Sequence, residues 1–462
     1  MSRLVVVSNR VAMPRAGRPA PGGLAVGVLA ALQDQGGIWF GWDGKVVDQA
    51  PGEPQCIEQD GITYATLSLA RRDYEQYYRG YANRVLWPLL HYRLTLLEYH
   101  RNYLGGYRRV NGWFARKLLP LLRPDDVIWI HDYHLVPLAS DLRDAGVENR
   151  IGFFLHTPFP PLEVLRALPG YESFLRWMLA YDFIGLQTRL DLHAFREAMT
   201  GALGGRAGPG DLLRLDSGSL RARAIPIGID VDQVAREAAR GRLSRQGQQL
   251  SRSLNRRSLI IGVDRLDYSK GLVERFRAYR QLLQHYPDYR GNVVLLQVAQ
   301  PSRSDVPEYR EIRHSLDAVT GEINGHFAEF DWTPIRYLSR SLSRPTVLGF
   351  MALTRVAMVT PLLDGMNLVA KEFVAAQDPE DPGVLVLSRL AGAAAELDRA
   401  VLVNPYDIDG MAEGLARALA MSRDERRERW EAMMQVLRRN DIRSWRRSFM
   451  HALQGTSRPV IG

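Results

Sequence analysis

One pattern constrains the fold of this chain more than any other: a short apolar run ends abruptly in polar residues or glycine, and a helix-like stretch follows. The 462-residue sequence repeats it clearly at residues 4–10, 126–134, 151–160, 259–271, 293–303 and 356–367. Continuous apolar runs of this length that alternate with helices are typical of parallel strands buried on both faces. We therefore predict an α/β fold with doubly wound sheets, in which ligands bind beyond the carboxyl ends of the strands.

The pattern occurs in both halves of the chain, and a polar, basic and helix-prone segment at 233–258 separates them. A chain of this length is also too long for one ordinary core. We predict a Rossmann-like N-terminal domain over 1–232 and a second Rossmann-like domain over 233–440, which face each other across a cleft. Residues 441–462 are expected to form a C-terminal helix that packs back on the N-terminal domain.

Composition excludes several classes of protein. Hydrophobic residues make up 46% and charged residues 24% of the chain, and no apolar run approaches the roughly 20 residues that span a bilayer. The first ten residues become polar too quickly for a signal peptide, so we expect a cytoplasmic protein with no membrane partner. The single cysteine, Cys56, excludes an internal disulfide framework. The net charge of +9 is spread over the whole chain, which argues against a nucleic-acid partner.

The loop that follows the apolar run at 259–263 carries two cations, Arg265 and Lys270. It lacks the order of a P-loop, because its lysine precedes the glycine. An arginine suits bidentate contact with phosphate and a lysine supplies a compact charge, so a diphosphate fits the pair. Surface ion pairs with Asp264 and Asp267 are the alternative, which the loop by itself leaves open.

A second strand ends just before Asp364, and a helix is expected to begin close to Asn367. The first backbone N–H groups of that helix, on Met366 to Val369, would point toward a bound anion. Glu372 lies about a turn and a half into the helix, where it could reach ribose hydroxyls. The alternative is that Asp364 and Asn367 are ordinary helix caps.

The glycine pair Gly22 and Gly23 stands at the mouth of an alanine- and leucine-rich helix. Glycines at this position let backbone N–H groups approach an anion, although a plain turn before a helix has the same sequence.

Histidines and aromatic residues suggest groups that bind a sugar. His131, Asp132 and His134 could hold a metal, but no further ligand cluster completes a zinc shell, so we expect no metal. His156 follows an apolar run and precedes a loop rich in proline. Rings such as Tyr78 and Trp87 could cover the apolar face of a sugar, although core packing explains each ring equally well. Two further arginines follow predicted strands, Arg10 and Arg303.

Several long motifs stand in a consistent order from the first residues to the C-terminal helices: GGLAVGVLAAL, WFGW, VLWPLLHYR, VIWIHDYHLVPLA, IGFFLHTPFP, VDRLDYSKGL, DGMNLVAKEFVAAQ and GVLVLS. Together they resemble the trehalose-6-phosphate synthase family of retaining glycosyltransferases, which have the GT-B fold. The resemblance covers nearly the whole chain. It implies transfer of glucose from UDP-glucose to glucose 6-phosphate, which gives trehalose 6-phosphate and UDP in trehalose biosynthesis.

The resemblance also implies a role for each candidate residue. The set that would bind UDP-glucose comprises Gly22, Gly23, His156, Arg265, Lys270, Leu342, Asp364, Gly365, Met366, Asn367, Leu368, Val369 and Glu372. The set that would bind glucose 6-phosphate comprises Arg10, Tyr78, Trp87, Asp132 and Arg303. The catalytic residues would be Arg265, Lys270, His156 and Asp364. The family uses a front-face transfer in which the leaving phosphate takes the acceptor's proton, with no cofactor; Mg²⁺ could modulate the reaction.

Two other functions are consistent with the same residues. A sugar-phosphate sensor would bind the substrates without turnover, and a related transferase would use another acceptor such as glycerol 3-phosphate. The partners are expected to be small molecules, and the sequence leaves open a homo-oligomer, either a dimer or a tetramer.

Overall fold

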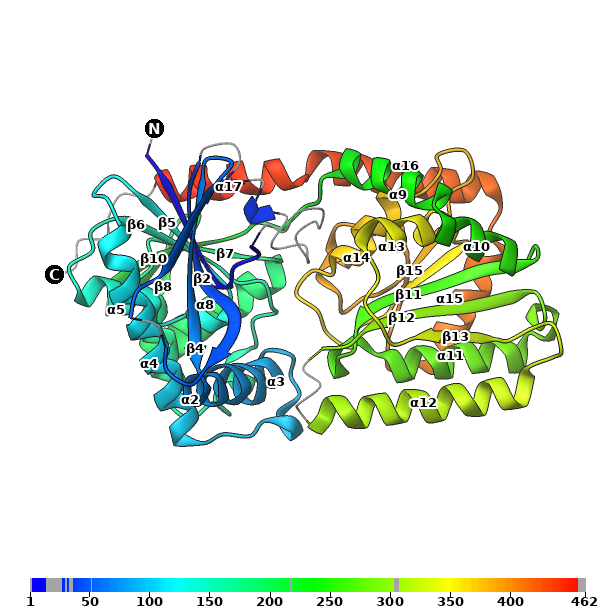
Figure 1. Ribbon diagram of the computed structural model, residues 1–462, viewed down its shortest axis with the longest axis horizontal. Helices are drawn as coiled ribbons and strands as arrows, with labels where there is room; N and C mark the ends of the chain where they lie inside the picture. Colours follow the sequence, from blue (N-terminus) through cyan, green and yellow to red (C-terminus); the bar gives the residue numbers. More distant parts are fainter. Residues whose placement is uncertain are drawn as a thin grey trace. The chain divides into compact units, whose positions relative to one another are not determined.

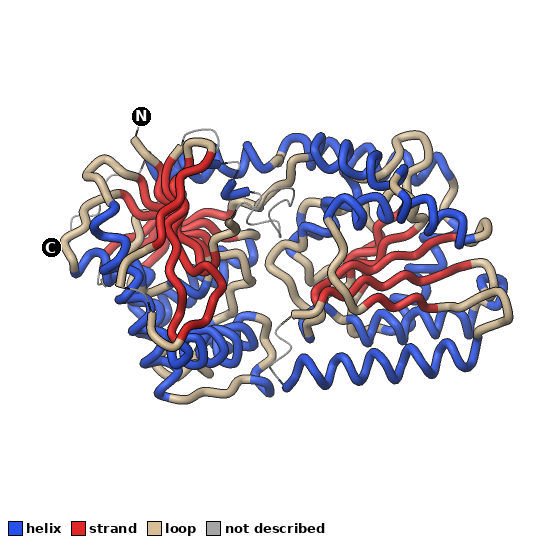
Figure 2. The backbone as a smooth tube through the Cα atoms, in the orientation of Figure 1, coloured by secondary structure: helices blue, strands red, loops and turns tan. Residues whose placement is uncertain are grey.

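The computed structural model describes residues 2–13, 27–29, 31–32, 36–50, 52–216, 218–302 and 307–455. The chain divides into two compact units. The first unit comprises Met1–Ile227 together with Arg443–Gly462, and the second comprises Gly228–Ile442. Each unit has a sheet of strands that helices cover (Figures 1 and 2).

Within the described residues, the first unit contains a ten-stranded sheet in the order β3-β4-β2-β1-β5-β6-β7-β10-β9-β8. The seven strands from β4 to β10 in this order pair in parallel, and antiparallel strands extend the sheet at both edges. The strands are β1 (Leu4–Arg10), β2 (Gly37–Val47), β3 (Gln55–Gln59), β4 (Ile62–Ala70), β5 (Val127–His131), β6 (Arg150–Phe154), β7 (Phe183–Leu186), β8 (Arg206–Ala207), β9 (Leu212–Leu215) and β10 (Gly218–Ala224).

The helices of the first unit include a rare π-helix, η1, over Tyr74–Leu86. The others in the described ranges are α2 (Arg71–Asp73), α3 (Trp87–Leu90), η2 (Leu94–Leu96), α4 (Arg101–Leu118), η3 (Leu119–Leu121), η4 (Tyr133–Leu135), α5 (Leu138–Asp144), α6 (Leu162–Leu165), α7 (Tyr171–Met178), α8 (Arg189–Leu203) and α17 (Ile442–Gln454).

Helix α17 packs on the first unit through aromatic rings, although almost all of the second unit precedes it in the chain. The ring of Phe449 lies 4.5 Å from that of Trp129 on β5 and 5.2 Å from that of Phe183 on β7. Trp445 lies 4.9 Å from Trp129. A Cβ at Gly152 on β6 would come within 2.8 Å of the Phe449 ring, so a glycine there makes room for the helix.

The six-stranded sheet of the second unit, as far as its residues are described, is parallel throughout and has the order β13-β12-β11-β14-β15-β16. Counted within the unit, this is the 3-2-1-4-5-6 order of the Rossmann fold. The strands are β11 (Ser258–Arg265), β12 (Val293–Gln300), β13 (Ile335–Leu338), β14 (Val356–Val359), β15 (Val384–Ser388) and β16 (Val401–Val403).

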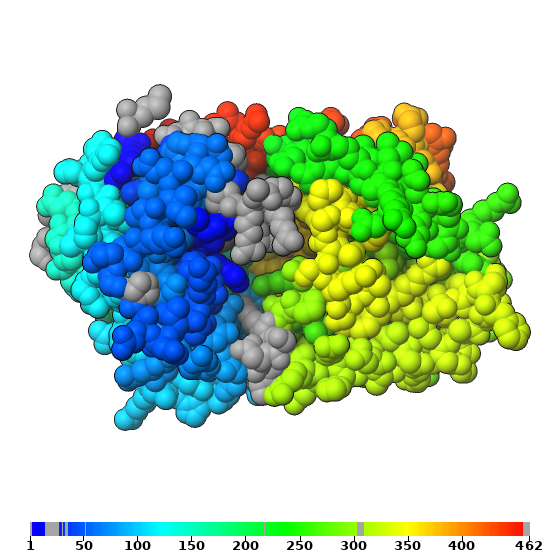
Figure 3. All heavy atoms as spheres, in the orientation of Figure 1, coloured from blue at the N-terminus to red at the C-terminus, as the bar shows by residue number. Residues whose placement is uncertain are grey.

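Helices lie on both faces of this sheet, with α9 and α10 at the surface of the unit (green in Figure 3). The described helices of the second unit are α9 (Val231–Leu243), α10 (Arg245–Leu254), η5 (Tyr268–Lys270), α11 (Leu272–His285), η6 (Pro287–Tyr289), α12 (Pro307–Phe327), α13 (Arg344–Met351), α14 (Leu368–Ala375), η7 (Gly392–Ala395), α15 (Ile408–Ala420) and α16 (Arg423–Arg439).

Helices α9 and α13 touch backbone to backbone. A Cβ at Gly241 would lie 1.9 Å from the carbonyl oxygen of Pro345, and one at Gly349 would lie 2.2 Å from the carbonyl carbon of Gly241. Because no real Cβ atom approaches backbone so closely, only glycine fits both positions.

The predicted α/β class with two doubly wound Rossmann-like sheets is confirmed. The strands β7, β13 and β16, of three or four residues each, were not among the six expected segments. Of the helices in the described ranges, none combines the length and apolarity that crossing a membrane requires.

Candidate active site

The candidate phosphate-binding residues of the second unit lie where its strand order reverses. β11 and β14 are neighbours in the sheet, and the strands that follow each of them lie on opposite sides. Arg265 is the last residue of β11, Lys270 ends the short helix η5 just beyond it, and Asp364 follows β14. In open parallel sheets such a reversal leaves a crevice at the carboxyl ends of the strands, where ligands bind.

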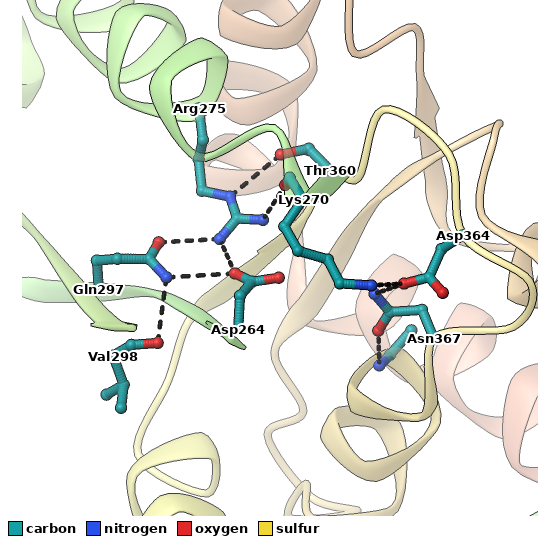
Figure 4. A network of polar contacts seen from close by, with 9 residues as sticks. Asp264, Lys270, Arg275, Gln297, Val298, Thr360, Asp364 and Asn367 are labelled. Carbon is teal, nitrogen blue, oxygen red and sulfur yellow. Dashed lines mark hydrogen bonds and ion pairs between the residues drawn. The ribbon is translucent and has the colours of Figure 1, made fainter. Parts of the chain in front are cut away.

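The structure brings Lys270, Asp364 and Asn367 together at this position (Figure 4). Lys270 Nζ lies 2.5 Å from Asp364 Oδ2, and Asn367 Nδ2 donates to the same oxygen at 3.0 Å. Asn367 is the N-cap of α14, with φ 75° and its Oδ1 accepting from Ala370 N at 3.3 Å. The predicted start of this helix is therefore correct, and its N-terminus adds N–H groups beside the lysine.

A buried arginine supports the loop that carries Lys270. Arg275, on α11, is fully buried and bonds to the carboxylate of Asp264 and to Gln297 Oε1 at 2.9 Å. It also donates to Thr360 Oγ1 at 3.1 Å and to the carbonyl of Lys270 at 3.5 Å (Figure 4). The Asp264 carboxylate thus belongs to a buried hydrogen-bond network that supports the loop.

The other aspartate of the loop, Asp267, caps η5. Its Oδ1 accepts from Ser269 N at 3.0 Å, and its Oδ2 accepts from the hydroxyl of Tyr309 at 3.0 Å. Both aspartates therefore shape the backbone of the loop, and Lys270 pairs with Asp364 from the next strand.

Glu372 lies one turn into α14, with two other charged side chains close to it. Arg344 donates to Glu372 Oε1 from Nε at 3.2 Å and from Nη2 at 3.1 Å, and to Glu237 Oε2 from Nη1 at 2.7 Å. Burial raises the pKa of Glu372, and Arg344 opposes that rise. Leu342 lies in the segment just before α13. Lys371, which directly precedes Glu372 on α14, points into the core, where it pairs with Glu396 at 2.6 Å.

Candidate residues of the first unit likewise gather where its strand order reverses, between β1 and β5. Arg10 ends β1, and its guanidinium lies 5.6 Å from the ring of Trp42 on β2. The ring of Tyr78, from η1, lies 5.3 Å from Trp42 and 6.0 Å from His134. An exposed arginine beside aromatic rings is suited to a phosphorylated sugar.

Asp132 follows β5 with φ 75°, a backbone conformation that residues other than glycine rarely adopt. Its Oδ1 accepts from the backbone N–H of His156 at 3.3 Å. Such a conformation costs on the order of 1–3 kcal/mol and is concentrated at functional sites.

Two hydrogen bonds determine which nitrogen of His156 carries its proton. Ile227 N donates to Gln187 Oε1 at 3.0 Å, so the amide nitrogen of Gln187 faces His156 Nδ1, 3.4 Å away. Nδ1 therefore accepts, and the proton sits on Nε2, which lies 3.1 Å from His131 Nδ1. Burial lowers the pKa of His156 to about 3 and that of His131 well below its ordinary value. Both rings are neutral.

Trp87 is buried, with its ring 4.0 Å from that of His91 and 5.8 Å from that of Tyr133.

Gly22, Gly23 and Arg303 lie outside the described residues. Among the residues that are described, no three histidine, cysteine, aspartate or glutamate side chains are grouped closely enough to hold a metal ion.

Sequence reasoning assigned no role to three side chains that now adjoin the candidates. Trp42 belongs to the quoted WFGW motif, which gave a usable signal for it. Gln187 directly follows β7, a strand that was not among the six expected segments. Arg344 had no such signal, because only tertiary packing brings it to Glu372.

Two sheets of Rossmann order, each with polar and charged groups beyond the reversal of its strands, define a glycosyltransferase of the GT-B class. The model of glycosyltransferase family 20 matches residues 4–455, and the chain belongs to this family.

Individual relatives agree with this assignment. A trehalose-6-phosphate synthase of Sinorhizobium fredii is 50% identical over 468 residues, which cover 99% of each chain. The structure of a UDP-forming α,α-trehalose-phosphate synthase from Burkholderia xenovorans in complex with glucose-6-phosphate is 52% identical, with a TM-score of 0.95 over 98% of this chain and 100% of that one. A trehalose-6-phosphate structure from E. coli bound with UDP-2-fluoro glucose is 46% identical, with a TM-score of 0.95 over 99% of this chain and 100% of that one.

Proposed function

We propose that this protein transfers glucose from UDP-glucose to glucose 6-phosphate with retention, and releases UDP and trehalose 6-phosphate. The observation that carries the proposal is the arrangement at the strand reversal of the second unit, where Lys270, Asp364 and the N-terminus of α14 meet. A lysine beside a helix N-terminus matches the negative charge of a diphosphate. The relatives bound with glucose-6-phosphate and UDP-2-fluoro glucose support the choice of substrates.

The second unit is proposed to bind the nucleotide sugar. Arg265 and Lys270 would contact the diphosphate, Asp364 the glucose, and Glu372 the ribose. The backbone around Leu342 would contact the uracil. The remaining donor contacts are proposed for Gly365, Met366, Asn367, Leu368 and Val369 of this unit, and for Gly22, Gly23 and His156 of the first unit.

Four of the five residues proposed to bind the acceptor belong to the first unit, and Arg303 belongs to the second. Arg10 and Arg303 would hold the 6-phosphate, and Tyr78, Trp87 and Asp132 would surround the sugar. The exposed guanidinium of Arg10 above the Trp42 ring supports this role, because it offers several N–H donors to a phosphate.

The chemistry follows from the charge that must be stabilised. As UDP leaves, negative charge grows on its β-phosphate while the glucose becomes oxocarbenium-like, so cations placed beforehand act mainly in the transition state. Arg265 and Lys270 would serve this purpose, and the Asp364 carboxylate that holds the lysine would also orient the glucose. A neutral His156 with a pKa of about 3 is a hydrogen-bonding group rather than a proton donor. The acceptor's proton would pass to the leaving phosphate.

We propose a cytoplasmic enzyme of trehalose biosynthesis with small-molecule partners and no cofactor, whose activity Mg²⁺ could modulate. A dimer or a tetramer is proposed for its assembly.

The test is to incubate the protein with UDP-glucose and glucose 6-phosphate and to follow UDP and trehalose 6-phosphate. Both products should form in equal amounts, and none should form without glucose 6-phosphate. Binding of both substrates with no UDP released would instead identify a sensor. Product formed only with another phosphorylated acceptor, such as glycerol 3-phosphate, would show that glucose 6-phosphate is not the acceptor.

A further inference from the structure

Arg344 connects three helices of the second unit at the end of the site that is proposed to hold the nucleoside. It is the first residue of α13, and its guanidinium reaches Glu237 on α9 and Glu372 on α14. All three side chains are largely buried, with exposures of 21%, 10% and 18% for Arg344, Glu237 and Glu372. A buried arginine between two carboxylates balances part of their charge.

The contacts with Glu372 are asymmetric. Both nitrogens that face it, Nε and Nη2, donate to the same oxygen, Oε1, at 3.2 and 3.1 Å. The guanidinium thereby fixes the rotation of the carboxylate and directs Oε2 away from itself. A carboxylate held in this way keeps one oxygen for other donors.

The backbone of Arg344 is itself held in place. Ser343 caps α13 by accepting from Thr346 N at 3.3 Å, and the hydroxyl of Thr346 donates to Gln246 Oε1 at 3.1 Å. The close contact of Gly241 with α13 leaves this helix no room to move toward α9. Arg344 therefore stands at a fixed place relative to Glu372.

We propose that Arg344 is a positioning residue for the donor nucleotide: it orients the Glu372 carboxylate toward the ribose hydroxyls and joins it to the segment that carries Leu342. This inference rests on the proposed function, in which Glu372 contacts the ribose. Arg344 does not touch the nucleotide in this arrangement, and it acts through Glu372.

The charges around Glu372 support the same role. Arg344 from α13 and Glu237 from α9 face its carboxylate, and Glu237 adds to the effect of burial in raising its pKa. Without Arg344, Glu372 would take up a proton at a higher pH and lose acceptor capacity toward hydroxyl groups. An Arg344→Ala variant should therefore lose ribose recognition first at the acid end of its pH range.

The experiment compares the binding of UDP with that of 2′,3′-dideoxy-UDP by calorimetry. The wild-type protein should bind UDP about 10- to 100-fold more tightly, because charge-assisted hydrogen bonds to the hydroxyls are absent from the analogue. Arg344→Ala should lose most of this preference and bind the analogue as the wild type does. Arg344→Lys keeps a charge at the site and should lose part of the preference.

The control is Arg355→Ala, which removes a more exposed arginine of the same unit that pairs with Asp381 at 3.3 Å, and it should leave the preference unchanged. Glu372→Ala should abolish the preference, and adding Arg344→Ala to it should cause no further loss. Equal weakening of UDP and the analogue in Arg344→Ala, or an unchanged preference in both Arg344 variants, would overturn the inference. A wild-type protein that does not bind UDP would overturn the proposed function itself.

Discussion

At the residue scale, the most informative side chain is His156, because its protonation follows from its surroundings. Gln187 cannot reverse its amide while Ile227 donates to its oxygen, and this assigns the proton of His156 to Nε2. The pKa of His156 is lowered to about 3 by burial, so the ring is almost entirely neutral near neutral pH. The rate should show no ionisation of this histidine between about pH 5 and 8.

Replacing Gln187 with glutamate should change that profile. Ile227 N–H can still donate to the new side chain, but a carboxylate now faces His156 Nδ1 and favours the charged ring. The pKa of His156 should rise by about 1–3 units, with the ring charged below the new value and neutral above it. ¹⁵N NMR of the imidazole would measure the change. Gln187→Leu removes the amide without adding charge and should leave the pKa low; an unchanged pKa in the glutamate variant would contradict the assignment.

The second residue-scale prediction concerns Lys270, whose ammonium contacts Asp364 at 2.5 Å. Lys270→Ala should lower kcat about 10²- to 10³-fold, the usual cost of losing a donor that stabilises transition-state charge. Steady-state kinetics with both substrates would measure it. Lys117→Ala, which breaks a surface pair with Glu53, is the control and should retain full activity. A Lys270→Ala enzyme with wild-type kcat would remove this lysine from the catalytic residues.

At the element scale, the contact of α9 with α13 depends on glycine. A Cβ at Gly349 would meet backbone atoms of Gly241 and Arg242 at 2.2 and 2.6 Å, and backbone cannot move aside as the end of a side chain can. This contact also sets the position of Arg344, five residues earlier on α13. The packing of two helices thus determines the geometry of a candidate site residue.

Gly349→Ala should therefore destabilise the second unit by about 1–3 kcal/mol or more, as overpacking does in other cores. Gly321 on α12 is the matched control, because apart from its chain neighbours and the backbone of its own helix no atom lies within 4 Å of a Cβ placed there. Gly321→Ala should be stabilising by about 0.5–1 kcal/mol, since alanine loses less backbone entropy in a helix. Urea unfolding of both variants would show the difference, and equal stability would mean that the helices separate at little cost.

At the scale of the whole molecule, the chain leaves the first unit after residue 227 and returns to it at residue 443. Trp445 and Phe449 hold this C-terminal segment on the first unit, because their rings pack on Trp129 of β5 and, for Phe449, also on Phe183 of β7. The stability of the first unit therefore depends on helix α17, which follows the second unit in the sequence.

Phe449→Ala should lower the free energy of unfolding of the first unit by about 3–5 kcal/mol, because a fully buried ring leaves a cavity when it is removed. Arg447→Ala, two residues earlier and exposed, should change it by no more than about 0.5 kcal/mol. Hydrogen exchange of amides in β5, β6 and β7 would locate the effect. Protection lost in the second unit alone would contradict the assignment of α17 to the first.

The sequence by itself determined the class of fold and the candidate residues at strand ends, because buried parallel strands have a continuous apolar pattern whose end is visible as a polar residue. Arg265 and Asp364 were found in this way, whereas the proposed acceptor role of Asp132 came from the resemblance to the family. Only the tertiary structure decided that Lys270 pairs with Asp364, that Asp264 bonds to Arg275, and that Arg344 reaches Glu372. These partners lie 94, 11 and 28 residues apart, and a pattern along the chain carries no information about which distant side chains the packing of helices and strands will bring into contact.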